Sequence, residues 1–172
     1  MKLVYLDNAA STKISSGVLE RMMESYSENY GNPSSTHKLG QKARAAIEKT
    51  RSMIAGYIGV ESKEIIFTSG GAEGNNLVIR GALNAYSSKG KHIITSKIEH
   101  STVLKTCQQL ENEGCEVTYI DVDENGVINL EQLENSIRKD TVIVSIMYAN
   151  NETGVKQPIE EIGQILENKD II

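Results

Sequence analysis

The sequence lacks any apolar run close to the roughly 20 residues that a membrane-spanning helix needs. Its N-terminus, MKLVYLDNAAST, also lacks the long apolar region of a secretory signal peptide. No run of lysine and arginine stands out, and the formal net charge of −5 gives no sign of a nucleic-acid-binding surface. These absences argue for a cytoplasmic protein that binds neither membranes nor nucleic acid.

Cysteine is also scarce. The chain has two, Cys107 and Cys115, and their spacing matches neither a C-x-x-C pair nor a zinc-binding pattern. Because cytosolic chains rarely keep disulfides, we interpret them as two ordinary reduced thiols, and we expect no metal site.

What remains is the composition of a soluble globular protein. Hydrophobic residues make up 39% of the chain and charged residues 24%, which is outside the range of disordered sequences. A chain of 172 residues is long enough to fold as one domain with a substantial core.

The first third of the chain predicts two helices. The segment SSGVLERMMESY has an apolar stripe at helical spacing, with Ser15 or Ser16 as the N-cap. The turn-forming segment YGNPSSTH interrupts the pattern around Asn32 and Pro33. A second helix follows in LGQKARAAIEKTRSMIAGYI, with one apolar face formed by Leu39, Ala43, Ile47, Ile54 and Ile58.

After Gly59 short apolar runs alternate with helical patterns. The runs predict strands at 64–68, 91–96, 116–122 and 141–147. The patterns predict helices at about 72–86, 101–113, 130–137 and 159–168. This alternation predicts an α/β fold with a mostly parallel sheet and flanking helices, preceded by an N-terminal helical arm. We divide the chain into an arm with its helices at 1–58 and an α/β domain at 59–172.

The last residues, ENKDII, predict the end of a helix, a short turn and the first residues of another buried strand. A domain seldom ends by opening a central strand. We therefore expect the sequence to be part of a longer protein.

Polar segments follow three of the predicted strands, where ligands bind in open α/β sheets. In TSGGAEGNN, Gly70 and Gly71 open the predicted helix, whose N–H groups and dipole favour an anion. No Gly-Lys-Ser/Thr follows, and Ser69 replaces the first glycine of a G-x-G-x-x-G pattern, so neither nucleotide-binding motif is present. A plain strand-to-helix turn fits the local pattern equally well.

The other two segments are SKIEHST and YANNETG. His100 could act as an acid or base near neutral pH, although a lone loop histidine is more often a surface residue, as is Lys97. Asn150 and Asn151 can donate and accept hydrogen bonds, and they could equally be turn formers. Together with the glycine turn, these residues predict a site for a small phosphorylated ligand.

Five segments resemble, in order, the N-terminal half of a cysteine desulfurase of the NifS/IscS type: YLDNAAST, YGNPSSTHKLG, FTSGGAEGNNL, SKIEHSTVLKTCQQLENEG and VSIMYANNETGVKQPI. The resemblance runs from about Leu3 to Ile172. Those enzymes use pyridoxal 5′-phosphate, have the fold-type-I architecture and belong to the class V aminotransferases. The resemblance implies conversion of L-cysteine to L-alanine and an enzyme-bound persulfide, by a homodimer that passes sulfur to an iron–sulfur scaffold or another acceptor protein.

The resemblance also implies roles for particular residues. The turn at Gly71 and Ala72 would hold the cofactor phosphate. His100 would stack on the pyridine ring and assist proton transfer, which makes it the candidate catalytic residue. Asn151 would lie near the phenolic oxygen and the substrate carboxylate, and the segment with Asn8 and Ala9 would line the substrate end of the cleft.

The sequence departs from this family at the phosphate turn. Ala72 stands where the family usually has a threonine whose hydroxyl bonds the phosphate, and Gly74 replaces a serine. A missing hydrogen bond of this kind costs about 1 kcal/mol or more, so we expect weaker cofactor retention than in a threonine-bearing relative.

The family's Schiff-base lysine, its persulfide-forming cysteine and further cofactor ligands have no counterpart in this sequence, and neither Cys107 nor Cys115 matches the catalytic cysteine. We therefore expect this chain alone to be inactive. Two alternatives stay open. The protein could be another fold-type-I enzyme, such as an aminotransferase, or a truncated non-catalytic paralogue that binds a partner or a phosphorylated ligand.

Overall fold

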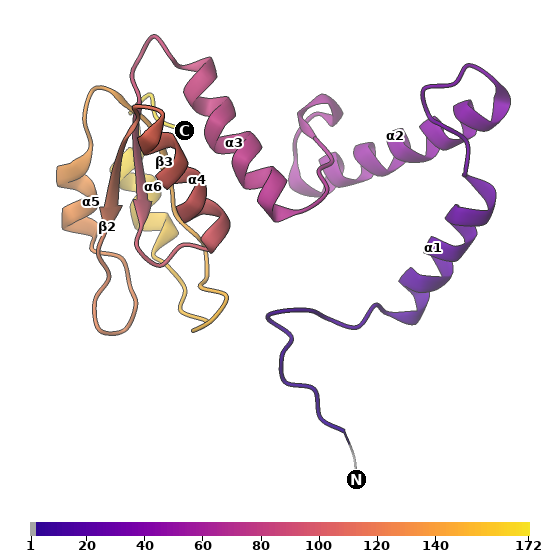
Figure 1. Ribbon diagram of the computed structural model, residues 1–172, viewed down its shortest axis with the longest axis horizontal. Coiled ribbons are helices and arrows are strands. Elements are labelled where there is room, and N and C mark those ends of the chain that lie inside the picture. The colour runs from indigo at the N-terminus through magenta and orange to yellow at the C-terminus, as the bar shows by residue number, and fades with distance from the viewer. Residues whose placement is uncertain (1–2) are drawn as a thin grey trace. The chain divides into compact units, whose positions relative to one another are not determined.

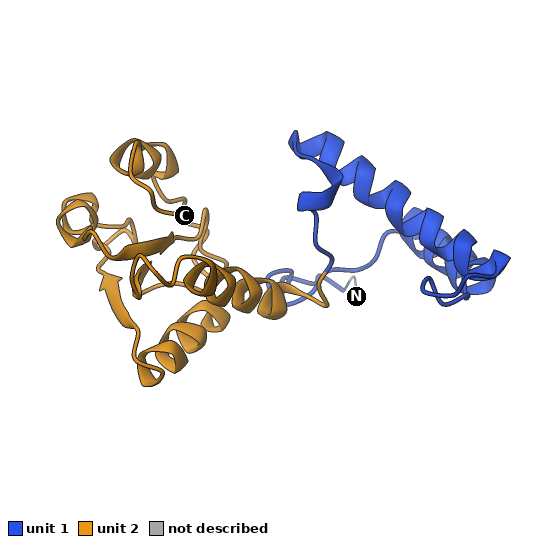
Figure 2. Ribbon diagram, turned by 90° about the horizontal axis from the view of Figure 1, so that it is seen from above, with its two compact units in different colours: residues 1–67 blue, residues 68–172 orange. Residues whose placement is uncertain are grey.

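The computed structural model describes residues 3–172, which form two compact units that meet between Phe67 and Thr68 (Figure 2). The domain division expected at residue 58 remains a prediction. No helix within residues 3–172 has the length and apolar character that crossing a membrane requires.

The first unit contains the two predicted helices. Helix α1 spans Ser16–Glu28 after Ser15 as N-cap, and helix α2 spans Lys38–Ile58 (Figure 1). Helix α2 ends at Gly59, whose φ of 75° lies in the left-handed region that glycine adopts without strain. Both helices are therefore where the sequence pattern predicts them.

The apolar faces of these two helices are mostly exposed. Helix α1 has no buried residue, and of the five residues expected on one face of α2 only Ala43 is buried. Ile47 and Ile58 keep 37% and 62% of their surface exposed. The apolar stripes of both helices are thus largely exposed within the described residues.

The predicted strand at 64–68 is not a strand. Its start belongs to the short 3-10 helix η1, Ser62–Glu64, and the residues after it are extended but pair with no strand in the described chain. An extended segment becomes a strand only when a neighbour takes up its backbone groups, and the apolar run alone could not reveal this. The Arg51 guanidinium holds the segment instead: it donates to the Ile65 carbonyl and lies 4.8 Å from the centre of the Phe67 ring.

The second unit contains the sheet, with β1 at His92–Ser96, β2 at Glu116–Ile120 and β3 at Thr141–Ser145. The strand order is β2-β1-β3 and both pairings are parallel, as predicted (Figure 1). The four helices α3, α4, α5 and α6 span Gly71–Ala85, Ser101–Asn112, Leu130–Ser136 and Ile159–Leu166.

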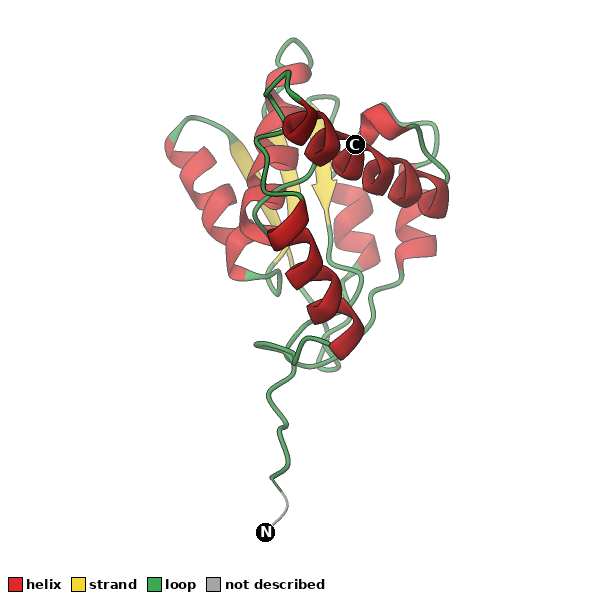
Figure 3. Ribbon diagram, turned by 90° about the vertical axis from the view of Figure 1, so that its right-hand side faces the viewer, coloured by secondary structure: helices red, strands yellow, loops and turns green. Residues whose placement is uncertain are grey.

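The helices cover both faces of this sheet (Figure 3). Helices α3 and α4 pack in one core cluster with Ile93 of β1, whereas α5 and α6 pack in a second cluster with the next residue, Ile94. Because successive strand residues point to opposite faces, the two clusters lie on opposite sides of the sheet. Cover on both faces explains why every residue of the central strand is buried, without the alternation of a half-exposed strand.

The chain's last residue pairs with β3. The Ile172 N–H donates to the Val142 carbonyl at 3.1 Å, and the Val144 N–H donates to the Ile172 carbonyl at 2.9 Å. Two bonds that flank one residue in this way are the pattern of a parallel strand, as expected for the start of a further strand. Ile172 itself is 48% exposed, so the expected burial is not present.

His92 is a fully buried polar residue at the start of the central strand. Its ring nitrogens lie 2.8 Å from the Thr141 hydroxyl on one neighbouring strand and 2.8 Å from the Thr118 hydroxyl on the other. Burial lowers the pKa of His92, and the nearby Arg138 guanidinium lowers it further. The ring is thus held neutral between the three strands.

We predict that protonation of His92 destabilises the second unit. As pH falls below about 6.5, the ordinary pKa of histidine, the unfolded chain takes up a proton more readily than the folded chain. The free energy of unfolding should then fall by up to about 1.4 kcal/mol per pH unit from this group, until the lower folded pKa is passed. Urea unfolding of wild type and His92→Gln between about pH 5 and 8 measures the difference in slope. Equal slopes in the two proteins would contradict the prediction.

Candidate functional site

The loops after β1 and β3 meet at one edge of the sheet. These strands are parallel neighbours, so their carboxyl ends point the same way, and the loop 97–100 and the loop 146–156 start side by side. The Asn150 side chain donates from Nδ2 to the Ile98 carbonyl at 3.0 Å and joins the two loops directly. The second and third polar segments of the sequence therefore form one site.

The buried side chain of Glu99 also joins the ends of β1 and β3. Its Oε1 accepts a hydrogen bond from the Ser96 hydroxyl at 2.8 Å and another from the Met147 N–H at 2.8 Å. The side chain is 7% exposed, and this burial raises the pKa of its carboxyl. Glu99 is thus a buried tie between the ends of β1 and β3, a role that its sequence position beside His100 did not reveal.

Asn150 and Asn151 have different roles. The Asn150 side-chain oxygen accepts from the N–H groups of Glu152 and Thr153, both at 2.9 Å, and so shapes the turn. Asn151 is exposed, and its side chain makes no hydrogen bond to any of residues 3–172. The turn-forming interpretation therefore holds for Asn150, while the amide of Asn151 remains available to a ligand.

A polar hollow of about 360 Å³ lies between these loops. It brings together His100 and Asn151, two residues chosen from the sequence. The full lining consists of Lys97, Ile98, Glu99, His100, Ser101, Asn150, Asn151, Glu152 and Thr153. The Lys97 ammonium is paired with Asp121 at 2.5 Å, in agreement with its interpretation as a surface residue.

His100 is the N-cap of α4, and its position is fixed by two neighbours. Its Nδ1 accepts from the Thr102 N–H at 3.2 Å and lies 2.8 Å from the Thr102 hydroxyl. The Asn75 side chain of α3 donates to the same hydroxyl at 2.8 Å. Neither Thr102 nor Asn75 was singled out from the sequence, because their contact joins two helices that are far apart along the chain.

The glycine turn at the start of α3 has the backbone expected of an anion site. Gly70 is the N-cap and Gly71 the first helical residue, so the N–H groups of Gly71 and Ala72 have no carbonyl of a preceding turn to bond. A Cβ added at either glycine would meet no other atom within 4 Å, which leaves the turn open. Asn75, one residue after this first turn, donates to Thr102 and so links α3 to the start of α4, where His100 lies.

One acidic side chain would compete with a bound phosphate for the N–H groups at the start of α3. The Glu73 carboxylate accepts from the Ser69 N–H at 2.6 Å, and this bond lowers the pKa of Glu73. A carboxylate so close reduces the attraction of the helix terminus for a second anion. Together with the missing hydroxyl at Ala72, it favours weak rather than tight phosphate binding.

Asn8 and Ala9 lie in a turn of the first unit, where the Ala10 N–H donates to the Asp7 carbonyl at 3.2 Å. Both residues are exposed. Their assignment to the substrate side of the cleft stays a prediction.

The cysteines behave as ordinary thiols. Cys107 of α4 is fully buried in the core cluster that α3 and α4 share, and burial raises its pKa to about 11. Cys115 is partly buried, and burial raises its pKa as well. Because only the thiolate is nucleophilic, neither group is prepared for attack at neutral pH.

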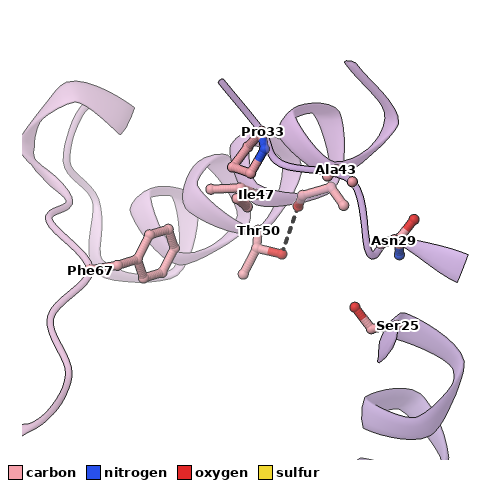
Figure 4. A pocket seen from close by; sticks show the side chains of 9 residues that line it. Ser25, Asn29, Pro33, Ala43, Ile47, Thr50 and Phe67 are labelled. Atoms are coloured by element: carbon pink, nitrogen blue, oxygen red, sulfur yellow. Dashed lines mark hydrogen bonds between the residues drawn. The ribbon is translucent and has the colours of Figure 1, made fainter. Parts of the chain in front are cut away.

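A second hollow, of about 480 Å³, lies within the first unit (Figure 4). Its lining includes Ile47, Phe67 and Thr50, whose hydroxyl donates to the Ala46 carbonyl at 3.0 Å. No charged residue lines it. The hollow at His100 is therefore the better candidate for polar chemistry.

We predict that the Glu99 tie contributes strongly to stability. Glu99→Ala would leave the Met147 N–H and the Ser96 hydroxyl without their partner and should cost about 2–4 kcal/mol of unfolding free energy. Glu99→Gln keeps the accepting oxygen and removes the buried charge, so its cost at neutral pH should stay below about 1 kcal/mol.

Urea unfolding of the two variants measures these costs. The exposed neighbour in the same hollow supplies the control, since Glu152→Ala should change stability by at most about 0.5 kcal/mol. A loss in Glu99→Ala no larger than that of the control would refute the tie.

Comparison with known proteins gives consistent matches along the chain. The aminotransferase class-V family matches residues 4–172. A cysteine desulfurase IscS of Glaesserella parasuis serovar 5 (strain SH0165) is 51% identical over 176 aligned residues, which cover 100% of this chain and 43% of that protein. The chain therefore spans less than half the length of this relative.

Solved structures agree in fold. A NifS-like protein superposes with a TM-score of 0.90 at 41% identity, over 96% of this chain and 46% of that one. The structure of SspA in complex with cysteine gives a TM-score of 0.86 at 44% identity, over 95% of this chain and 47% of that one.

Proposed function

Because the chain belongs to the aminotransferase class-V family and is related to the cysteine desulfurases, we propose that it carries the phosphate turn and the ring-facing histidine of a pyridoxal 5′-phosphate site. The observation that carries the proposal is the series of hydrogen bonds from Asn75 of α3 through Thr102 to His100, next to a hollow that also contains Asn151.

The residues of the second unit fit three parts of this cofactor. The unpaired N–H groups of Gly71 and Ala72 suit a phosphate. The exposed imidazole of His100 can stack on an aromatic ring, and the amide of Asn151 can donate to a phenolic oxygen or a carboxylate. When bound, pyridoxal phosphate supplies an electron sink for substrate carbanions.

The chain's own contribution is binding and orientation. The α3 turn would hold the phosphate, while the tie at Glu99 keeps the loops of His100 and Asn151 in register. The ring nitrogen of His100 that faces away from Thr102 would donate a hydrogen bond to the bound group.

The same proposal extends to the reaction that the whole protein catalyses. In the whole protein we expect conversion of L-cysteine to L-alanine and an enzyme-bound persulfide, in a cytoplasmic homodimer that delivers sulfur to an iron–sulfur scaffold or another acceptor. A lysine and a cysteine outside this sequence would complete the chemistry.

An aminotransferase on the same fold is the second candidate, and the family match favours it. An assay of the full-length protein for alanine and sulfide released from cysteine would separate the two candidates.

We predict that the phosphate turn limits cofactor affinity. Ala72→Thr adds a hydroxyl that can bond the phosphate and should tighten pyridoxal phosphate binding about fivefold, the effect of one net hydrogen bond. Ala72→Val has the same branched shape without the hydroxyl and should leave the affinity near that of wild type. Fluorescence titration of the 172-residue chain measures all three affinities. An equal affinity in the threonine and valine variants would disprove the role of the turn.

Borohydride reduction in the presence of pyridoxal phosphate, followed by mass mapping, completes the test. We expect no stoichiometric lysine adduct, because no lysine of this chain matches the Schiff-base position. One specific adduct would contradict the proposal that the anchoring lysine lies outside it.

A further inference from the structure

The hydrogen bonds around His100 can each be assigned a donor and an acceptor. The Asn75 Nδ2 group can only donate, so the Thr102 hydroxyl oxygen accepts from it at 2.8 Å. The Thr102 N–H donates to His100 Nδ1 at 3.2 Å, and the hydroxyl of the same threonine lies 2.8 Å from that nitrogen. Two polar groups of Thr102 thus contact one nitrogen of the ring, and Asn75 bonds the hydroxyl of the same threonine.

These contacts determine the tautomer of the ring. An N–H donor faces Nδ1 from the Thr102 backbone, so a hydrogen on Nδ1 would point toward another hydrogen. Nδ1 must then be an acceptor, and the Thr102 hydroxyl, which already accepts from Asn75, is free to donate to it. A neutral imidazole carries one N–H, so His100 carries it on Nε2.

We infer that Asn75 and Thr102 are positioning residues that hold neutral His100 as an Nε2–H donor. The consequence for chemistry rests on the proposed function: a neutral His100 would donate a hydrogen bond from Nε2–H to a ligand acceptor, and would have no free lone pair on that nitrogen with which to remove a proton. The same contacts link α3, the helix whose first turn is the proposed phosphate site, to the orientation of this ring.

Reversing one hydrogen bond tests the inference. In Asn75→Asp the introduced carboxylate can only accept, so it draws the Thr102 hydroxyl hydrogen away from His100 and leaves the hydroxyl oxygen to accept from Nδ1–H. Asn76→Asp is the matched control: it adds the same charge one residue along α3, where the native side chain donates to the Ala72 carbonyl and not to Thr102.

The readout is the nitrogen-15 NMR spectrum of the imidazoles in the 172-residue chain, recorded near pH 9, well above the ordinary histidine pKa of about 6.5. The chain has three histidines, and a His100→Gln variant assigns the signals. The unprotonated nitrogen resonates far downfield of the protonated one, so the spectrum reports the tautomer directly.

We expect wild type and Asn76→Asp to show an unprotonated Nδ1. In Asn75→Asp the ratio of the Nε2–H to the Nδ1–H form should fall at least about fivefold, the effect of one net hydrogen bond. A wild-type ring protonated on Nδ1, or equal ratios in the two aspartate variants, would overturn the inference.

A second pair of variants covers the case in which Asn75→Asp does not fold. Thr102→Ser keeps the hydroxyl and should give the wild-type ratio, whereas Thr102→Val removes it and should lower the ratio about fivefold. Equal ratios in serine and valine variants would also overturn the inference. None of these spectra requires pyridoxal phosphate, so a failure of the chain to bind it would reject the proposed function and leave the tautomer result standing.

Discussion

The candidate site depends on the parallel pairing of β1 with β3. This pairing sends the loops that follow both strands to the same edge of the sheet, where His100 and Asn151 meet around one hollow. Burial of β1 on both faces, beneath α3 and α4 on one side and α5 and α6 on the other, fixes the register of the strands. The site is therefore a consequence of the core rather than an independent feature of the loops.

Glu99 connects that core to the surface chemistry. A buried carboxylate is costly unless its oxygens are bonded, and this one accepts from a residue of β1 and from the chain just after β3. His100 is the next residue, so its backbone is held in place by the buried Glu99. The ring of His100 is then oriented by Thr102, which Asn75 supports. Rigid support of this kind suits the role against a cofactor ring that is proposed for His100.

The sequence predicted features that depend on local patterns. The start of α3 at Gly71 follows from adjacent glycines, and the strands of the second unit follow from short apolar runs between helical segments. The prediction of a strand at 64–68 was wrong because a strand also needs a neighbouring strand to pair with, which an apolar run cannot specify. The contacts of Glu99 and of the pair Asn75 and Thr102 could not be foreseen, since each joins segments that meet only after folding.

The phosphate turn shows how a family resemblance and local chemistry can differ. The family match extends through residues 4–172, yet Ala72 supplies no hydroxyl and the Glu73 carboxylate bonds the backbone of the same turn. Both features weaken the attraction for an anion without changing the fold. Under the proposed function, affinity for the cofactor would depend on the backbone N–H groups of α3 and on ring contacts at His100.

The central claim is that one edge of the sheet receives a phosphorylated aromatic cofactor. Backbone NMR of the chain during addition of pyridoxal phosphate tests it most directly, with inorganic phosphate added to a second sample. The account predicts shifts confined to residues 70–74, 97–102 and 150–153 with the cofactor, and only to 70–74 with phosphate. Shifts that fall elsewhere, or none at all, would contradict it.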